Sequence, residues 1–195
     1  LNSIDGEHFP KVIDTLQYKD YNCIVFPYYN NKDVFDTIVP QLPITDDVIM
    51  ENIAKMAKPI YDLHQYNIAH LDIKMENYLI NKENTNFMLI DYGSSCNMDT
   101  FIPTLMTMGT KQYLPLEVLN NRPGLKSDVW SLGCIAIILH LNQKIEINNY
   151  PVDTQHYLDK VSDQNYHIKD FLKDTLVLDH KKRLSIEELY QKYFL

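Results

Sequence analysis

The sequence predicts a single α+β domain, with short strands near its start and helices through most of the rest. Two runs rich in Val, Ile and Phe, residues 11–16 and 22–27, come first, and a long segment with helical periodicity follows them. Two short apolar runs, 78–80 and 87–90, then precede a chain that reads as helices from Lys126 to its end. A length of 195 residues suits one well-packed domain and is too short for two of ordinary size.

Each element has a local signal. The polar residues 17–21 predict a turn between the first two strands, and the polar residues 30–33 end this region. Apolar residues at 34, 35 and 38 then predict a short helix, which Pro40 and Pro43 end.

Thr45 is the expected N-cap of a long helix that runs to about residue 66. Pro59 lies inside this helix and predicts a kink. The apolar side chains that recur every three or four residues, and should face the core, are Val48, Ile49, Ile53, Met56, Ile60 and Leu63.

The runs 78–80 and 87–90 predict a hairpin with a polar turn over 81–86. The clearest later helices are expected over 168–178 and 185–193, and the apolar run 135–141 predicts a buried helix.

Composition excludes several classes of protein. The formal net charge is −8, from 18 basic and 26 acidic residues, which argues against a nucleic acid or an anionic membrane as the main partner. The run 135–141 is too short to cross a bilayer, and no signal segment opens the chain, so neither membrane insertion nor secretion is expected. Cys23, Cys96 and Cys134 match neither a disulfide framework nor a zinc pattern, which favours a reducing, cytoplasmic or nuclear compartment. We expect Cys134 to be an inert core thiol.

The stretch His70 to Asn77 carries the residues that point to chemistry, together with Asp91, which follows Asn77 by fourteen residues. Alone, such polar residues in a loop would usually form a solvated turn. Phosphoryl transfer needs one carboxylate to orient an acceptor hydroxyl, a second carboxylate and an amide oxygen to hold Mg²⁺, and a lysine to offset phosphate charge. Asp72, Asp91, Asn77 and Lys74 supply this set, and a hairpin can bring Asn77 and Asp91 together.

These residues resemble the catalytic loop and the metal-binding triplet of the eukaryotic-type protein kinase family. The resemblance implies that Asp72 is the catalytic aspartate and Lys74 its partner, and that Asn77 and Asp91 hold the metal. The Asp-x-Lys spacing and the later Thr110 resemble the serine/threonine class, in which that threonine ties the substrate segment to the catalytic aspartate.

Three later motifs continue the resemblance in order. Residues 113–117 lie where the family's Ala-Pro-Glu motif closes the activation segment, residues 127–133 resemble the signature of its central buried helix, and residues 179–184 resemble a late helical segment. In the family, the aspartate of the central helix, here Asp128, supports the backbone of the catalytic loop. The resemblance also implies a structural ion pair between Arg183 and Glu117.

Residues 23–29 resemble the last strand of the kinase N-lobe and the hinge. The resemblance therefore implies a protein kinase-like fold, with residues 1–29 a remnant of the N-lobe sheet and 30–195 a mainly helical C-lobe. ATP and Mg²⁺ are the implied cofactors. The residues that would contact the nucleotide are Phe26, Tyr28, Tyr29, Asp33 and Leu79.

The chain departs from the family pattern in two respects. None of its five glycines is grouped, so it has no Gly-x-Gly-x-x-Gly loop, and the lysine and glutamate that grip the phosphates should precede Glu7. With Leu1 in place of Met, this suggests a fragment of a longer kinase and reduced activity for the chain alone. Leu71 replaces the arginine that commonly binds a phosphorylated residue, so we expect no activating phosphate on Thr100, Thr104 or Thr107.

The leading hypothesis is a serine/threonine protein kinase that transfers the γ-phosphoryl group of ATP to protein hydroxyls. The alternative is a truncated pseudokinase that acts as a binding or inhibitory module, for example by pairing with another kinase. A small-molecule kinase is a weaker third possibility, because the segment from Gly109 to Glu117 resembles a platform for a peptide substrate.

Overall fold

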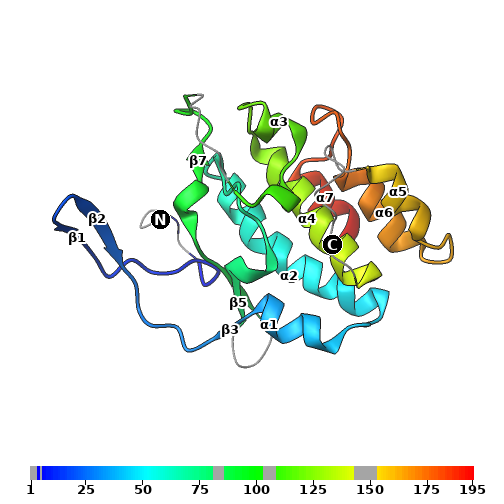
Figure 1. Ribbon diagram of the computed structural model, residues 1–195, viewed down its shortest axis with the longest axis horizontal. Helices are drawn as coiled ribbons and strands as arrows, with labels where there is room; N and C mark the ends of the chain where they lie inside the picture. Colours follow the sequence, from blue (N-terminus) through cyan, green and yellow to red (C-terminus); the bar gives the residue numbers. More distant parts are fainter. Residues whose placement is uncertain (1–3, 5, 81–85, 103–108, 143–152) are drawn as a thin grey trace.

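The structure is a computed structural model that describes residues 4, 6–80, 86–102, 109–142 and 153–195. Two long helices, α2 (Asp46–His64) and α4 (Leu125–Leu141), pack against each other at its centre (Figure 1). Helices α5 (Thr154–Lys160), α6 (Tyr166–Thr175) and α7 (Ile186–Tyr193) lie beside them on one side, and the strands lie on the other. The α+β class is confirmed, with strands near the start of the chain and a mainly helical C-terminal part.

Helix α2 begins where the sequence predicts, because the Thr45 hydroxyl accepts a hydrogen bond from the Val48 amide at 3.5 Å. The predicted apolar stripe is fully buried at Ile49, Ile53, Met56, Ile60 and Leu63. Val48 is wrongly assigned to that stripe, since its side chain is 41% exposed and the stripe faces the core only from Ile49 onward.

The later helices agree with prediction to within a few residues. Helix α6 begins two residues earlier than predicted and ends at Thr175, and Ser185 caps α7 by accepting from the Glu188 amide at 3.2 Å. Helix α4 contains the run 135–141 and buries Cys134 completely, which raises the pKa of this thiol and keeps it protonated. No helix in the described part of the chain is long and apolar enough to cross a membrane.

Three short antiparallel strands, β3 (Lys32–Asp33), β5 (Tyr78–Ile80) and β6 (Phe87–Leu89), form a sheet in the order β3-β5-β6. The predicted hairpin of β5 and β6 is confirmed, while most of its predicted turn, residues 81–85, lies outside the described residues. A second pair joins β4 (Ile68–Ala69) to β7 (Cys96–Asn97).

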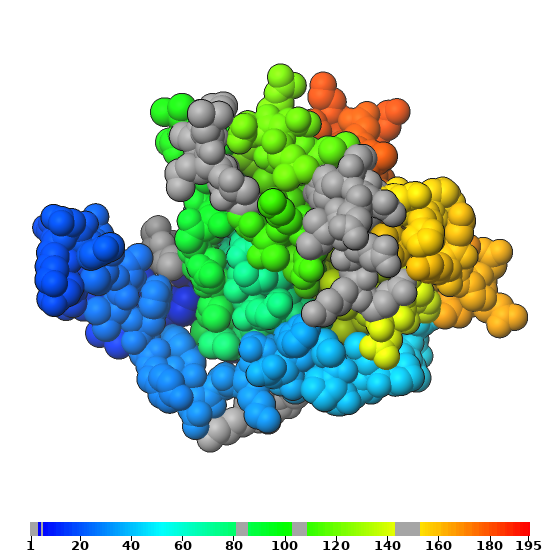
Figure 2. All heavy atoms as spheres, viewed as in Figure 1, coloured from blue at the N-terminus to red at the C-terminus, as the bar shows by residue number. Residues whose placement is uncertain are grey.

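Strands β1 (Asp14–Tyr18) and β2 (Tyr21–Val25) form a hairpin that projects from the body of the molecule (Figures 1 and 2). The predicted turn over 17–21 is too long, because Tyr18 pairs with Tyr21 and Lys19 takes a left-handed conformation with φ of 54°. The hairpin and the segments beside it expose several large apolar side chains, namely Ile13, Leu16, Tyr18, Tyr21, Ile24, Phe26 and Tyr28.

Short helical elements lie between the strands and the longer helices. Helix α1 (Val34–Ile38), predicted from three apolar residues, continues into the 3₁₀ turn η1 (Val39–Gln41). Three more 3₁₀ turns follow, η2 (Met75–Asn77) at the end of the predicted catalytic loop, η3 (Tyr92–Ser94) and η4 (Lys111–Tyr113), and then the one-turn helix α3 (Leu116–Leu119).

Gly133 sets the distance between α4 and α6. A Cβ atom at this position would lie 2.4 Å from the Thr175 Oγ1 atom and 2.9 Å from a Leu176 methyl carbon. We therefore expect Gly133→Ala to lower the free energy of unfolding by about 1–3 kcal/mol, as overpacking of a core does. Urea denaturation measures this, with Gly124→Ala as control, since a Cβ at Gly124 meets nothing within 4 Å. Equal losses for the two variants would contradict the close approach of the helices.

Candidate active site

A buried carboxylate on α4 holds the start of the predicted catalytic loop. Asp128 is fully buried, and its two oxygens accept hydrogen bonds from the His70 and Leu71 amides, each at 2.8 Å. The His64 Nε2 atom at the end of α2 lies 2.9 Å from the same carboxylate. A buried carboxylate is costly unless it is hydrogen-bonded, and these contacts meet that need, as the sequence predicts for Asp128.

His70 links the loop to Ile90, the residue that follows strand β6. Its Nδ1 atom accepts from the Asp72 amide at 3.3 Å, so the neutral ring carries its proton on Nε2, which donates to the Ile90 carbonyl at 3.1 Å. Burial disfavours the charged ring and lowers the pKa of His70, although the charges of Asp128 and Asp72 and the Ile90 bond act in the opposite direction.

This lowered pKa makes stability depend on pH. Below the ordinary histidine pKa of about 6.5 the unfolded chain binds a proton that folded His70 does not, so stability should fall as the pH drops from 7.5 to 5.5. We expect His70→Gln to show a shallower fall in the free energy of unfolding over this range. Urea denaturation at both pH values measures the difference, and equal slopes would show that His70 titrates normally in the folded protein.

The side chains predicted to act in transfer converge on Asp72. Its Oδ2 atom accepts from Lys74 Nζ at 2.9 Å and from the Asn77 amide nitrogen at 3.2 Å, and its Oδ1 atom accepts from the Thr110 hydroxyl at 2.7 Å. Lys74 Nζ also lies 3.1 Å from the Thr110 hydroxyl oxygen. Residues separated by up to 38 positions in the chain therefore form one hydrogen-bonded cluster.

Two opposing effects set the charge of Asp72. Burial raises the pKa of a carboxyl group, but the hydrogen bonds from Lys74, Thr110 and Asn77 and the lysine charge outweigh burial and lower it. Asp72 is therefore an ionised carboxylate at neutral pH, which can accept a hydrogen bond or a proton from a hydroxyl group.

The hairpin places Asp91 beside Asn77, as its register requires. The Ile90 amide donates to the Asn77 carbonyl at 2.9 Å, so Asp91 follows directly on the residue paired with Asn77. Asp91 is exposed and has a left-handed backbone with φ of 63°, and its Oδ1 atom accepts from the Gly93 amide at 3.3 Å. The Asn77 amide nitrogen also donates to the Asp72 carbonyl at 2.8 Å, so its amide oxygen is the atom left to bind a cation.

These oxygen donors fit Mg²⁺ better than a metal that needs a complete protein cage. Within the described residues, no group of three or more His, Cys, Asp or Glu side chains could hold a metal ion alone. Mg²⁺ usually takes one or two protein oxygens, with waters and phosphate oxygens filling its other positions. Asn77 and Asp91 match that requirement.

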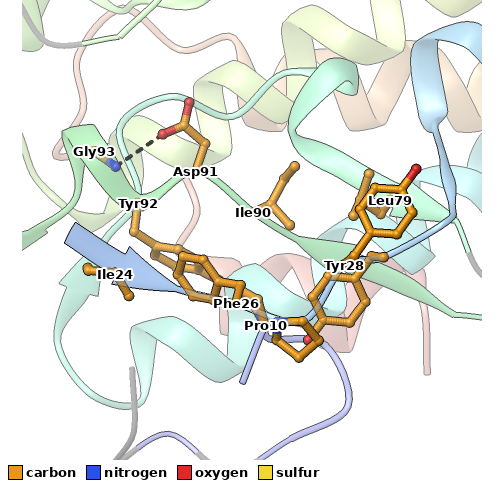
Figure 3. Close-up of a pocket in the computed structure, with 11 residues that line it drawn as sticks. Pro10, Ile24, Phe26, Tyr28, Leu79, Ile90, Asp91, Tyr92 and Gly93 are labelled. Atoms are coloured by element: carbon orange, nitrogen blue, oxygen red, sulfur yellow. Dashed lines mark hydrogen bonds between the residues drawn. The ribbon is translucent and has the colours of Figure 1, made fainter. Parts of the chain in front are cut away.

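A mainly apolar cavity of about 510 Å³ lies beside Asp91, which is one of its lining residues (Figure 3). The Phe26 side chain lies near Pro10, and the Asp91 side chain points away from them. Such a size and lining are typical of a small-molecule site. Its lining residues are Pro10, Ile24, Phe26, Pro27, Tyr28, Tyr29, Leu79, Ile90, Asp91, Tyr92 and Gly93.

Four of the five predicted nucleotide contacts, Phe26, Tyr28, Tyr29 and Leu79, line this cavity. The fifth, Asp33, does not. Asp33 pairs with Leu79 across β3 and β5, but its carboxylate caps α1 by accepting from the Asp36 amide at 2.7 Å. Helix capping accounts for this side chain.

Sequence reasoning missed other lining residues, among them Pro10, Ile24 and Ile90. Pro10 reaches the cavity because the preceding segment lies along β6, where the His8 carbonyl accepts from the Leu89 amide at 2.9 Å. No local pattern in the sequence indicates a contact between residues this far apart.

The ion pair between Arg183 and Glu117 that the resemblance implies is present. Arg183 donates to the Glu117 Oε1 atom at 2.5 Å and to the Lys126 and Val177 carbonyls at 2.7 and 2.8 Å. Both side chains are buried, and the guanidinium lies 5.0 Å from the centre of the Trp130 ring. This network ties α3 to α4 and to the segment before α7.

The sequence is similar to those of known proteins. The family model described as "Protein kinase domain" matches residues 1–195. The chain is 26% identical to smooth-muscle myosin light chain kinase of Gallus gallus over 94% of its length, and 28% identical to serine/threonine-protein kinase kin-29 of Caenorhabditis elegans over 96%. It spans 10% and 24% of the lengths of these two relatives.

Proposed function

The chain belongs to the protein kinase domain family, and from this premise we propose that it is the acceptor and metal-binding part of a serine/threonine protein kinase. The observation that carries the proposal is the cluster around Asp72, in which Lys74, Asn77 and Thr110 all lie within hydrogen-bond distance of one carboxylate. Kinases of this family use ATP and Mg²⁺ and act on protein substrates.

Asp72 would act on the acceptor hydroxyl group. As an ionised carboxylate held at both oxygens, it can orient the hydroxyl group of a substrate and accept its proton. Lys74, which bridges Asp72 and Thr110, would offset negative charge on the phosphoryl group as it transfers. Thr110 would keep the substrate-binding segment aligned with the loop, since its hydroxyl group donates to Asp72.

Asn77 and Asp91 would hold the metal through their side-chain oxygens. When bound, Mg²⁺ would neutralise charge on the phosphates. The Asn77 amide nitrogen is fixed by two bonds to Asp72, so the metal site and the acceptor site share one framework.

The apolar cavity would take the adenine ring. Phe26, Tyr28 and Tyr29 come from the segment that follows β2, and Leu79 comes from β5, so the base would lie between these two segments. We propose that residues 1–29 belong to the N-lobe and 30–195 to the C-lobe, with the cavity at their junction. The serine/threonine class is supported by Thr110 and by the name of one relative, serine/threonine-protein kinase kin-29.

A binding module without catalysis is the second candidate function. The observation that favours it is the exposed apolar hairpin of β1 and β2, where Ile13, Tyr18 and Tyr21 are 63%, 61% and 71% exposed. Contiguous exposed apolar side chains are common at protein–protein contacts. The catalytic proposal is preferred because the Asp72 cluster has a complete set of polar partners that binding alone would not require.

Transfer of labelled phosphate from ATP to a general protein substrate tests the proposal. The assay is run on this chain and on any longer polypeptide that contains it, with Mg²⁺ or with EDTA. We expect Mg²⁺-dependent labelling of serine or threonine. Labelling of tyrosine would contradict the class, and ATP binding without transfer by every polypeptide would favour the binding module.

A further inference from the structure

We propose that Leu71 is a positioning residue that aligns the catalytic loop with the substrate-binding segment by inserting into a small apolar cluster. This inference rests on the proposed function and adds a residue that does not touch the reacting groups. The cluster, called here the Leu71 cluster, contains the buried residues Ala69, Leu71, Leu114 and Val118, with Cys96, Met98 and Leu125 packed around them.

The Leu71 cluster is separate from the main core. Its members come from four parts of the chain: strand β4 with the loop that follows it, strand β7 and the residue after it, the stretch 114–118, and the start of α4. Leu71 is 2% exposed, and Leu114, which follows η4, is also 2% exposed. Apolar packing therefore joins the loop that carries Asp72 to the segment that carries Thr110.

The backbone at Leu71 is held in an unusual conformation. Leu71 has φ of 64°, a left-handed value that residues other than glycine seldom adopt. Its amide donates to Asp128 at 2.8 Å, and its side chain is enclosed by the cluster. Strained residues persist only where their surroundings fix them, and they gather at functional sites.

The substrate-binding segment approaches Leu71 at a second point. Gly109 has φ of 72°, and a Cβ atom there would lie 2.2 Å from the Leu71 carbonyl oxygen and 2.8 Å from a Leu114 methyl carbon. The Gly109 amide donates to the Ser94 hydroxyl at 3.3 Å, which links this point to the segment after Asp91. The two segments that the Asp72–Thr110 hydrogen bond joins are therefore also in contact at Leu71, where Gly109 lies against the Leu71 carbonyl group.

Loss of this packing should change the position of Asp72 relative to Thr110 without opening the nucleotide cavity, which Leu71 does not line. A displacement of about 1 Å at a catalytic group can reduce a rate about 10²-fold. Because the cluster is apolar, any apolar side chain of similar volume at position 71 should keep Asp72 in place, and no specific polar group is required.

The test compares Leu71→Ala with Leu71→Met, which restores most of the volume, and with Leu189→Ala. Leu189 is fully buried in α7 and belongs to the main core, so its truncation removes the same atoms outside the Leu71 cluster. We expect Leu71→Ala to lower kcat about 10²-fold with the KM for ATP unchanged. Leu71→Met should recover most of the rate, and Leu189→Ala should retain it where the protein is still folded.

Amide hydrogen exchange of the same variants gives a second readout that needs no catalysis. Exchange should rise in residues 69–72 and 109–119 of Leu71→Ala, and should remain as in the wild type there for Leu189→Ala. Equal effects of the two truncations on rate or on exchange would overturn the proposal, as would failure of Leu71→Met to recover. If the wild-type protein transfers no phosphate, the proposed function fails, and the exchange pattern still decides the positioning role.

Discussion

Replacing Asp72 with Asn is expected to reduce the rate of phosphoryl transfer by about 10²–10⁴-fold, the usual contribution of a general acid–base group. The change preserves the shape of the side chain and removes its charge. Thr110 can still donate to the remaining oxygen, but Lys74 Nζ loses the negative partner that now lies at 2.9 Å. Steady-state kinetics with saturating Mg²⁺ and ATP measure the loss.

The Asp72→Asn result needs a control for the removal of one negative charge. Asp170→Asn provides it, because Asp170 lies on α6 outside the candidate site and its side chain is 54% exposed. This control should keep the wild-type rate, and both variants should still bind ATP. A wild-type rate in Asp72→Asn would rule out Asp72 as the group that acts on the acceptor.

Replacing Glu117 with Ala should lower the free energy of unfolding by about 3–5 kcal/mol, because it leaves a buried charge without its partner. The Arg183 side chain is fully buried, and only the Glu117 carboxylate neutralises its charge at hydrogen-bond distance in the described structure. The carbonyls of Lys126 and Val177 still accept from Arg183 in the variant, but they carry no net charge. Urea denaturation measures the change.

A double-mutant cycle separates the ion pair from simple loss of packing. Combining Glu117→Leu with Arg183→Met removes both charges, and we expect this variant to be more stable than either single change. Asp170→Ala breaks an exposed pair with Lys173 and should cost less than about 1 kcal/mol. Additive losses for the double variant would contradict a coupled buried pair.

The parts of the fold that the sequence predicts are those with a local signal. Helix α2 has a cap at Thr45 and an apolar period, and the hairpin of β5 and β6 has two apolar runs around a polar turn. Strands β3, β4 and β7 have two residues each, too few to show a period, so only tertiary pairing reveals them.

The residues of the candidate site likewise fall into two groups, those that the sequence identifies and those whose role only the structure reveals. Asp72, Lys74 and Asn77 lie within six residues, so their spacing identifies them, and the contact of Thr110 with Asp72 that the resemblance implies is present as a hydrogen bond of 2.7 Å. The sequence shows Leu71 only as a residue that cannot bind phosphate. Its place in an apolar cluster depends on Cys96, Leu114 and Val118, which are 25 to 47 positions away in the chain and have no local pattern that points to it.

Leucine in place of arginine at position 71 predicts that no phosphate is needed on the threonines after Asp91. Thr104 and Thr107 lie outside the described residues, while Thr100 is described and exposed. The burial of Leu71 among apolar side chains supports the prediction, because no cationic group occupies that position to bind a phosphate.

The proposed function requires Asp72 and Asp91 to belong to one metal-dependent site for phosphoryl transfer. Single-turnover transfer from ATP, measured against Mg²⁺ concentration for the wild type, Asp72→Asn and Asp91→Asn, tests it most directly. We predict that the wild type transfers only with Mg²⁺, that Asp72→Asn stays slow at every Mg²⁺ concentration, and that Asp91→Asn needs more Mg²⁺. Transfer by the wild type in EDTA, or identical Mg²⁺ profiles for the three proteins, would show that Asp72 and Asp91 do not form such a site.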